Sequence, residues 1–114
     1  MDDCIFCKVA EGEIKAGIVY SDDVVLAFND IKPQAPVHIL VIPRRHIERF
    51  QDVAEGDMPV MNHMLNVIPK IARIAGIDGS GYRLVINCDR DAGQEVFHLH
   101  AHLMGGRKFS WPPG

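Results

Sequence analysis

The chain contains a run near its end in which three histidines alternate with apolar residues, His98-Leu99-His100-Ala101-His102-Leu103-Met104. Because successive side chains of a β-strand point to opposite faces, a strand here would carry the three imidazoles on one face of a sheet. A neutral imidazole, with an ordinary pKa of about 6.5, has a lone pair available at pH 7. A merely solvated face would more often use Thr, Lys, Glu and Ser. The spacing therefore favours either a zinc site or a nucleophilic centre acting on phosphorus.

A glycine-containing turn directly precedes the histidines, over Asp91-Ala92-Gly93-Gln94-Glu95-Val96. Turns of this kind can point backbone N–H groups at an anion. Most such turns only connect strands, so the pattern is weak by itself. Its position beside the histidines predicts amide donors next to a phosphate held there.

The three cysteines include a Cys-x-x-Cys pair, Cys4 and Cys7, and a separate Cys88. An odd count, in a chain that begins without the basic and apolar segments of a signal peptide, argues against a disulfide framework. We therefore expect a cytoplasmic protein with free thiols. The pair is either two small residues beside an amphipathic turn or two metal ligands, whereas Cys88 and His63 have no partner visible in the sequence.

Length and charge exclude several classes of protein. The 114 residues include 12 Lys and Arg against 15 Asp and Glu, a formal charge of −3, and 47% of them are hydrophobic. This composition predicts one soluble domain over residues 1–114. It argues against long nucleic acids as partners, because their binding needs clustered positive charge, although a single nucleotide is not excluded. No apolar run approaches the roughly 20 residues of a membrane-spanning helix, so no membrane partner is expected.

The hydrophobic pattern predicts the elements that position the histidines. Apolar residues recur at steps of three and four between residues 52 and 76, which predicts the main helix. Its apolar stripe comprises Met58, Met61, Met64, Leu65, Ile68, Ile71, Ala72 and Ala75. Pro69 predicts a kink or break near Val67–Ile68, because proline inside a helix costs about 3 kcal/mol.

Strands are predicted at 18–20, 24–28, 38–43, 82–87 and 96–104, with a proline-containing loop at 29–36. In the last strand we expect Phe97, Leu99, Ala101 and Leu103 to face the helix. The predicted fold is α+β, an antiparallel sheet with the main helix packed on one face.

The whole chain resembles the histidine triad (HIT) family, whose signature His-φ-His-φ-His-φ-φ, with φ apolar, fits residues 98–104 at every position. Further matching segments are Ile5-Phe6, Leu26-Ala27-Phe28, Asp30-Ile31, Pro33-Gln34-Ala35-Pro36, His38, Val41-Ile42-Pro43, Gly93-Gln94, Gly105-Gly106-Arg107 and Trp111-Pro112-Pro113-Gly114. The Trp-Pro-Pro-Gly ending is most similar to the Hint branch, the purine nucleoside phosphoramidases. The resemblance implies the HIT fold in a two-fold dimer, with one sheet continuous across both subunits.

The resemblance also implies a reaction. A purine nucleoside phosphoramidate, such as adenosine phosphoramidate or AMP-lysine, would be hydrolysed to nucleoside monophosphate and amine through a covalent nucleotidyl-histidine, without a cofactor. His100 would attack phosphorus, His102 would bind phosphate oxygens, and His98 and His38 would orient the nucleophile. The implied nucleotide-binding residues are Phe6, Phe28, Asp30, Ile31, Asn87, Gly93, Gln94, Glu95, Val96 and Trp111, the last approaching the other subunit's site.

Some bacterial HIT proteins bind structural zinc, and the residues that match their ligands here are Cys4, Cys7, His46 and His98. Two positions depart from the animal Hint pattern. Glu95 stands where those proteins have a serine donor near the leaving group, and Asn29 replaces the histidine before Asp30. Alternatives are a dinucleoside polyphosphate hydrolase of the same family, a nucleotide-binding scaffold with incidental activity, and a metal-dependent hydrolase that uses the three histidines as ligands.

Overall fold

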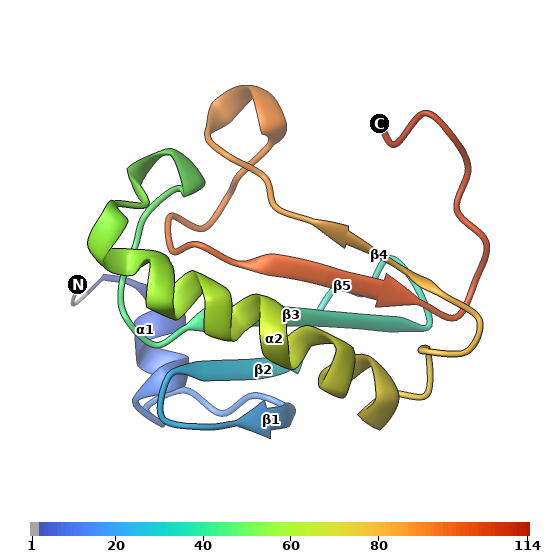
Figure 1. Cartoon of the computed structure of the whole chain (residues 1–114), viewed down its shortest axis with the longest axis horizontal. Helices are drawn as coiled ribbons and strands as arrows, with labels where there is room; N and C mark the ends of the chain where they lie inside the picture. The colour runs from blue at the N-terminus through green and yellow to red at the C-terminus, as the bar shows by residue number, and fades with distance from the viewer. Residues whose placement is uncertain (1–2) are drawn as a thin grey trace.

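The computed structural model describes residues 3–114, which form a five-stranded antiparallel sheet with helix α2 across one face (Figure 1). The strand order is β1-β2-β3-β5-β4. The strands are β1 (Ile18–Ser21), β2 (Val25–Asn29), β3 (Val37–Pro43), β4 (Tyr82–Val85) and β5 (Ala101–Gly105), and the helices are α1 (Ile5–Ala10) and α2 (Met58–Ile74). This arrangement confirms the predicted α+β fold. No helix within the described residues is both long and apolar enough to cross a membrane.

The two faces of the sheet bury different sets of residues. Val25, Ala27, Ile39 and Val41 pack in one core cluster with α2, together with Leu99, Ala101 and Leu103. Residues of opposite parity pack in a second cluster with α1, namely Leu26, Phe28, Leu40 and Ile42 with Phe6 and Val9. Because side chains alternate along a strand, His38 on β3 and His102 on β5 project on the α1 face. Helix α1, not α2, therefore shares a face with the imidazoles.

The last strand is shorter than predicted, because β5 begins at Ala101 and not near residue 96. In the β3–β5 ladder Ala101 pairs with Val41, so continued pairing would place Leu99 opposite Pro43. Proline has no N–H to donate to a ladder. The Leu99 N–H instead donates to the Ile47 carbonyl at 2.6 Å. The segment 95–100, which carries two of the three histidines, is thus irregular backbone next to the sheet.

The prediction that alternate residues of this segment face the helix is confirmed for Leu99, Ala101 and Leu103. It is wrong for Phe97, which is 42% exposed. Strict alternation requires a strand, and Phe97 lies before the strand starts. Strand β4 likewise ends at Val85, two residues earlier than expected.

Helix α2 runs without interruption through Pro69, so the predicted break is wrong. Pro69 is exposed, and so is Leu65, whose carbonyl loses its helical partner to the proline. The proline thus lies on the exposed side of the helix, where solvent can reach a carbonyl that has no helical partner. Met58 and Leu65 were predicted in the buried stripe but are 45% and 57% exposed, and Val67 is buried in addition to the predicted residues.

The Asp22 carboxylate joins the β1–β2 turn to helix α2. It accepts hydrogen bonds from the Tyr20 hydroxyl and the His63 ring, both at 2.7 Å, and from the amides of Val24 and Val25 at 2.8 and 2.7 Å. Burial by itself would raise the pKa of Asp22, but these four bonds outweigh it and hold the pKa well below its ordinary value. His63, which has no partner visible in the sequence, thus has a structural one.

We predict that Asp22→Ala lowers the free energy of unfolding by about 1–3 kcal/mol, because several hydrogen-bond donors lose a charged acceptor. Asp23→Ala is the matched control, since Asp23 is exposed and lies next in the chain. Chemical denaturation at pH 7 measures both. Because the folded pKa is depressed, the stabilisation by Asp22 should be complete at pH 7 and decline as the pH falls below about 4. Equal losses in the two variants would contradict this role.

Candidate active site

His38, His100 and His102 form one cluster of imidazoles on the α1 face. The ring centroids of His100 and His102 are 5.0 Å apart, and those of His38 and His102 are 5.1 Å apart. Phe6 of α1 packs edge-on against His100 at 5.1 Å and against Phe28 at 5.4 Å. Phe6 and Phe28, which the resemblance implies bind the nucleotide, thus form an aromatic wall beside the predicted nucleophile.

Backbone and side-chain partners determine the tautomers of His38 and His102. The Gln34 amide donates to His38 Nδ1 at 3.0 Å, so that nitrogen carries no proton and His38 Nε2 carries one. His38 Nε2 then donates to His102 Nδ1 at 2.9 Å, with the Asp30 carboxylate 3.4 Å away. His102 Nδ1 is therefore an acceptor, and the remaining proton of neutral His102 lies on Nε2. This nitrogen is a hydrogen-bond donor for a ligand.

The tautomer of His100 is determined by a backbone carbonyl. His100 Nδ1 lies 2.7 Å from the carbonyl oxygen of His98, which can only accept, so Nδ1 carries the proton. In the neutral ring Nε2 then has a free lone pair. The arrangement provides a nucleophile with its other nitrogen already hydrogen-bonded.

Burial keeps these rings neutral. It lowers the pKa of His38, His98 and His100 below the ordinary histidine value, with partial compensation from Asp30 at His38, from the Pro43 carbonyl at His98, and from the His98 carbonyl at His100. The pKa of His102 falls furthest, to about 4, through burial and then the proximity of His100 and His38. At pH 7 the cluster is uncharged, so lone pairs are available for attack.

The turn before the histidines is held by the buried side chain of Gln94. Its oxygen accepts from the Asp89 amide at 2.8 Å, and its nitrogen donates to the carbonyls of Glu48 and Val96 at 2.8 and 3.0 Å. The Gln94 amide itself donates to the Asp89 carbonyl. Of the amides predicted at 94–96, those of Glu95 and Val96 have no partner within residues 3–114. The amides predicted to donate to a phosphate are therefore reduced to those of Glu95 and Val96.

The other predicted nucleotide-binding residues have very different exposures. Phe6 and Phe28 are buried, whereas Ile31 is 92% exposed in the loop that follows β2. Asn87 is half-buried after β4, and Gly93 adopts a left-handed φ of 81° at the end of the turn. Trp111 is 82% exposed. Ile31 and Trp111 thus have little contact with the rest of their own chain.

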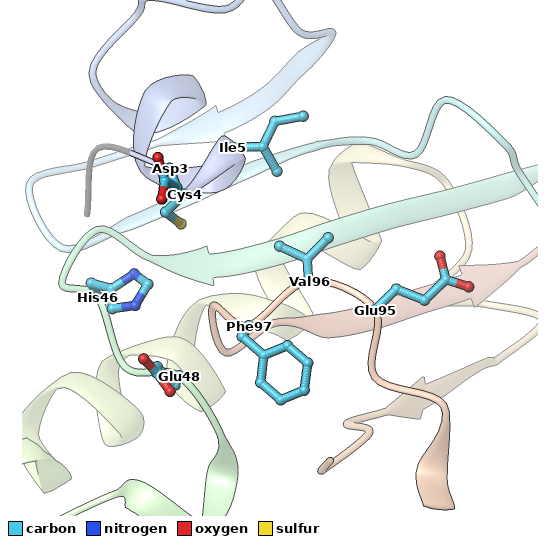
Figure 2. Close-up of a pocket in the computed structure, with 8 residues that line it drawn as sticks. All are labelled: Asp3, Cys4, Ile5, His46, Glu48, Glu95, Val96 and Phe97. Carbon is cyan, nitrogen blue, oxygen red and sulfur yellow. The ribbon is translucent and has the colours of Figure 1, made fainter. Parts of the chain in front are cut away.

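A cavity of about 360 Å³ opens beside Cys4 and His46 (Figure 2). Its lining is Asp3, Cys4, Ile5, His46, Glu48, Glu95, Val96 and Phe97. Of the predicted nucleotide-binding residues only Glu95 and Val96 line it, and no imidazole of the His38, His100 and His102 cluster does. The cavity therefore borders Cys4 and His46, and the imidazole cluster lies outside its lining.

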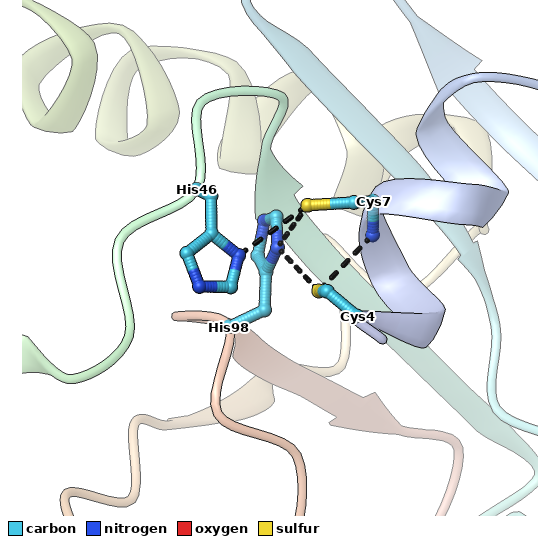
Figure 3. Close-up of side chains that lie close together, drawn as sticks. All are labelled: Cys4, Cys7, His46 and His98. Carbon is cyan, nitrogen blue, oxygen red and sulfur yellow. Dashed lines mark hydrogen bonds between the residues drawn. The ribbon is translucent and has the colours of Figure 1, made fainter. Parts of the chain in front are cut away.

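Cys4, Cys7, His46 and His98 converge from distant parts of the chain (Figure 3). His98 Nδ1 lies 3.3 Å from Cys4 Sγ and 3.5 Å from Cys7 Sγ, and His46 Nδ1 lies 3.3 Å from Cys7 Sγ. Zinc bonds of about 2.3 Å to sulfur and 2.1 Å to nitrogen imply S···N separations of about 3.6 Å in a tetrahedron. The four donor atoms thus have nearly the spacing of a Cys₂His₂ zinc site.

The protonation of His98 also suits a metal ligand. Its Nε2 donates to the Pro43 carbonyl at 2.7 Å, which leaves the Nδ1 lone pair directed at the thiols. Burial, together with the neighbouring Cys4, raises the pKa of Cys7 to about 11. A bound cation would favour the thiolate that such a site requires.

A second group, Asp30, His38 and His102, also brings donor atoms close together. However, His38 Nε2 carries a proton because Nδ1 accepts from Gln34, so this nitrogen is not a metal ligand. Neither group contains His100. The geometry disagrees with a hydrolase in which the three triad histidines share one metal, because His98 faces the cysteines while His102 faces His38.

Two groups that organise the site were not predicted as functional. The Gln34 amide determines the His38 tautomer, and the Pro43 carbonyl determines that of His98. Both lie in segments that carry the family resemblance, Pro33-Gln34-Ala35-Pro36 and Val41-Ile42-Pro43. Their contributions come from the backbone, so the residue types did not indicate them.

The HIT domain family model matches residues 11–109, and the chain belongs to this family. An uncharacterised HIT-like protein of Synechocystis sp. is 48% identical over 113 residues, which cover 99% of this chain and 98% of that protein. A crystal structure of a HIT family hydrolase from Legionella pneumophila has a TM-score of 0.95 and 48% identity, covering 98% of this chain and 100% of that one. A histidine triad protein from Clostridium difficile has a TM-score of 0.93 and 49% identity, covering 96% of each chain.

We predict that the His102 ring titrates with a midpoint near 4, because burial and two neighbouring imidazoles disfavour its charged form. An NMR titration of the ring proton signals measures this, and the His102→Asn variant assigns the signal. A midpoint near the ordinary histidine value of about 6.5 would contradict the buried, neutral cluster.

Proposed function

We propose that the protein hydrolyses purine nucleoside phosphoramidates, such as adenosine phosphoramidate and AMP-lysine, through a covalent nucleotidyl-His100 intermediate. The observation that carries the proposal is the 2.7 Å hydrogen bond from His100 Nδ1 to the His98 carbonyl, which leaves Nε2 as the nucleophilic atom. The family membership and the aromatic wall of Phe6 beside His100 support a nucleotide as substrate.

In the first step the His100 Nε2 lone pair attacks the α-phosphorus and the P–N bond to the amine breaks. The attacking ring gains positive charge, which the His98 carbonyl stabilises at Nδ1–H. His102 Nε2–H donates to a phosphate oxygen, and the amides of Glu95 and Val96 take up the charge developing on the other oxygens. His38 acts through His102, because its ring contacts that histidine. The amine leaves with the electron pair of the P–N bond and takes one proton from solvent water.

In the second step water attacks phosphorus and releases a proton to solvent. The bond from phosphorus to Nε2 breaks, its electron pair returns to Nε2, and nucleoside monophosphate leaves. Asp30 binds the ribose hydroxyls, Phe6, Phe28 and Ile31 contact the purine, and Asn87 binds on the phosphate side. The chain needs no cofactor for either step. Glu95 replaces a hydroxyl donor with a carboxylate, so we expect it to alter the choice of leaving amine.

We also propose a two-fold homodimer with a continuous sheet. Strand β4 is an edge strand, and its Tyr82 and Leu84 are 37% and 42% exposed. Trp111, which is 82% exposed on its own chain, would reach the other subunit's site and cover its nucleotide.

The Cys₂His₂ centre would hold structural zinc through Cys4, Cys7, His46 and His98, tying α1 to the sheet. We predict one zinc per chain in the purified protein by elemental analysis, and loss of that zinc in Cys7→Ser. Cys88→Ser is the control, since Cys88 lies outside the centre. Zinc-free protein after purification and after zinc titration would contradict this site.

We predict a pre-steady-state burst of amine release from adenosine phosphoramidate, with one equivalent per active site, if intermediate hydrolysis limits turnover. His100→Ala should lose the burst and at least about 10³-fold of kcat, because the nucleophile acts as a unit with its partners. His102→Ala should bind AMP more weakly and retain a slow burst. Full turnover in His100→Ala would contradict the mechanism.

The same assay separates the alternatives. Diadenosine polyphosphates should turn over far more slowly than phosphoramidates, and the reverse order would favour the polyphosphate hydrolase. Glu95→Ser should change the relative rates for neutral and cationic leaving amines while leaving the burst intact. Equal rates in Glu95→Ser and wild type for every amine would show that Glu95 does not influence the leaving amine.

A further inference from the structure

The Cys₂His₂ centre and the proposed nucleophile share a residue. The His98 side chain lies between the two cysteines, whereas its main-chain carbonyl accepts the proton of His100 Nδ1. One residue therefore supplies both a side chain of the centre and the backbone acceptor that selects the His100 tautomer. Because His98 precedes β5, the sheet ladder does not hold this carbonyl in place.

A second connection passes through helix α1. Phe6 lies between Cys4 and Cys7 in the sequence, and its ring packs edge-on against both His98, at 6.1 Å, and His100, at 5.1 Å. The helix has six residues, too few to be stable alone. Its position depends on the apolar cluster around Phe6 and on its two cysteines.

A third connection passes through the other histidine of the centre. Ile47 directly follows His46, and the Ile47 carbonyl accepts the Leu99 N–H at 2.6 Å. Leu99 lies between His98 and His100. Each histidine of the centre thus directly precedes one partner of this backbone hydrogen bond, which ties the segment to the loop after β3.

We propose that the Cys4, Cys7, His46 and His98 centre positions the nucleophile, so that metal occupancy sets the rate of P–N bond cleavage as well as the stability of the fold. His98 is the positioning residue, and it acts on His100 through its carbonyl. The expected effect on the reaction rate rests on the proposed function. The expected effect on the His100 tautomer does not depend on any substrate.

The test compares zinc-loaded protein with protein freed of metal by a strong chelator under reducing conditions, alongside Cys7→Ser and the control Cys88→Ser. Long-range ¹H–¹⁵N NMR of the histidine rings reports the tautomer, circular dichroism reports folding, and the burst rate, kcat, KM and the AMP dissociation constant are measured. We expect His100 to change from the Nδ1–H tautomer to a mixture of both in the metal-free forms. We expect the rate of the burst of amine release, which measures P–N bond cleavage, to fall at least tenfold, more than AMP affinity falls. Zinc should restore this rate in wild type but not in Cys7→Ser.

Folded metal-free protein with an unchanged His100 tautomer and an unchanged burst rate would overturn the proposal, and so would protein that never binds zinc. If Cys7→Ser does not fold, the chelated wild type decides. If that also unfolds, the centre stabilises the fold only and the proposal is wrong. A metal-dependent tautomer in a protein whose turnover survives His100→Ala would support the coupling and contradict the proposed function.

Discussion

The hydrogen bond from His100 Nδ1 to the His98 carbonyl, 2.7 Å long, is the constraint on which the site depends. It leaves a single nitrogen with a free lone pair, on the ring that faces Phe6. The carbonyl is available because residues 95–100 do not pair with β3, where Pro43 lacks an N–H. The Pro43 carbonyl is satisfied by the His98 ring instead. One proline thus ends the ladder and helps to organise the imidazoles.

The two-sided core explains why the buried imidazoles are neutral and yet have hydrogen-bond partners. Helix α2 packs one face of the sheet, and α1 covers the other beside the rings. Burial lowers the pKa of His38, His98, His100 and His102. Within residues 3–114, however, every buried side-chain nitrogen and oxygen has a hydrogen-bond partner. Preorganised donors of this kind need little rearrangement when charge develops on a substrate.

The sequence predicted the features that follow from local pattern. These include the strands at 18–20, 24–28 and 38–43, the main helix, and the apolar face of Leu99, Ala101 and Leu103. It failed where tertiary partners compete with the pattern. The alternation around His98 predicted a strand, but bonds to Ile47 and Pro43 took its place. Pro69 predicted a kink or break in α2, yet the helix continues through this proline, which lies on its exposed face. Tautomers depend on backbone acceptors, which residue types do not reveal.

The most direct test of the account is the position of the covalent adduct. Protein mixed with adenosine phosphoramidate is quenched in alkaline denaturant within the first turnover, and ³¹P NMR with peptide mass spectrometry then locates the nucleotidyl group. The account predicts attachment to His100 at Nε2, because Nδ1 donates to the His98 carbonyl. Attachment at Nδ1, or on His98 or His102, would contradict it.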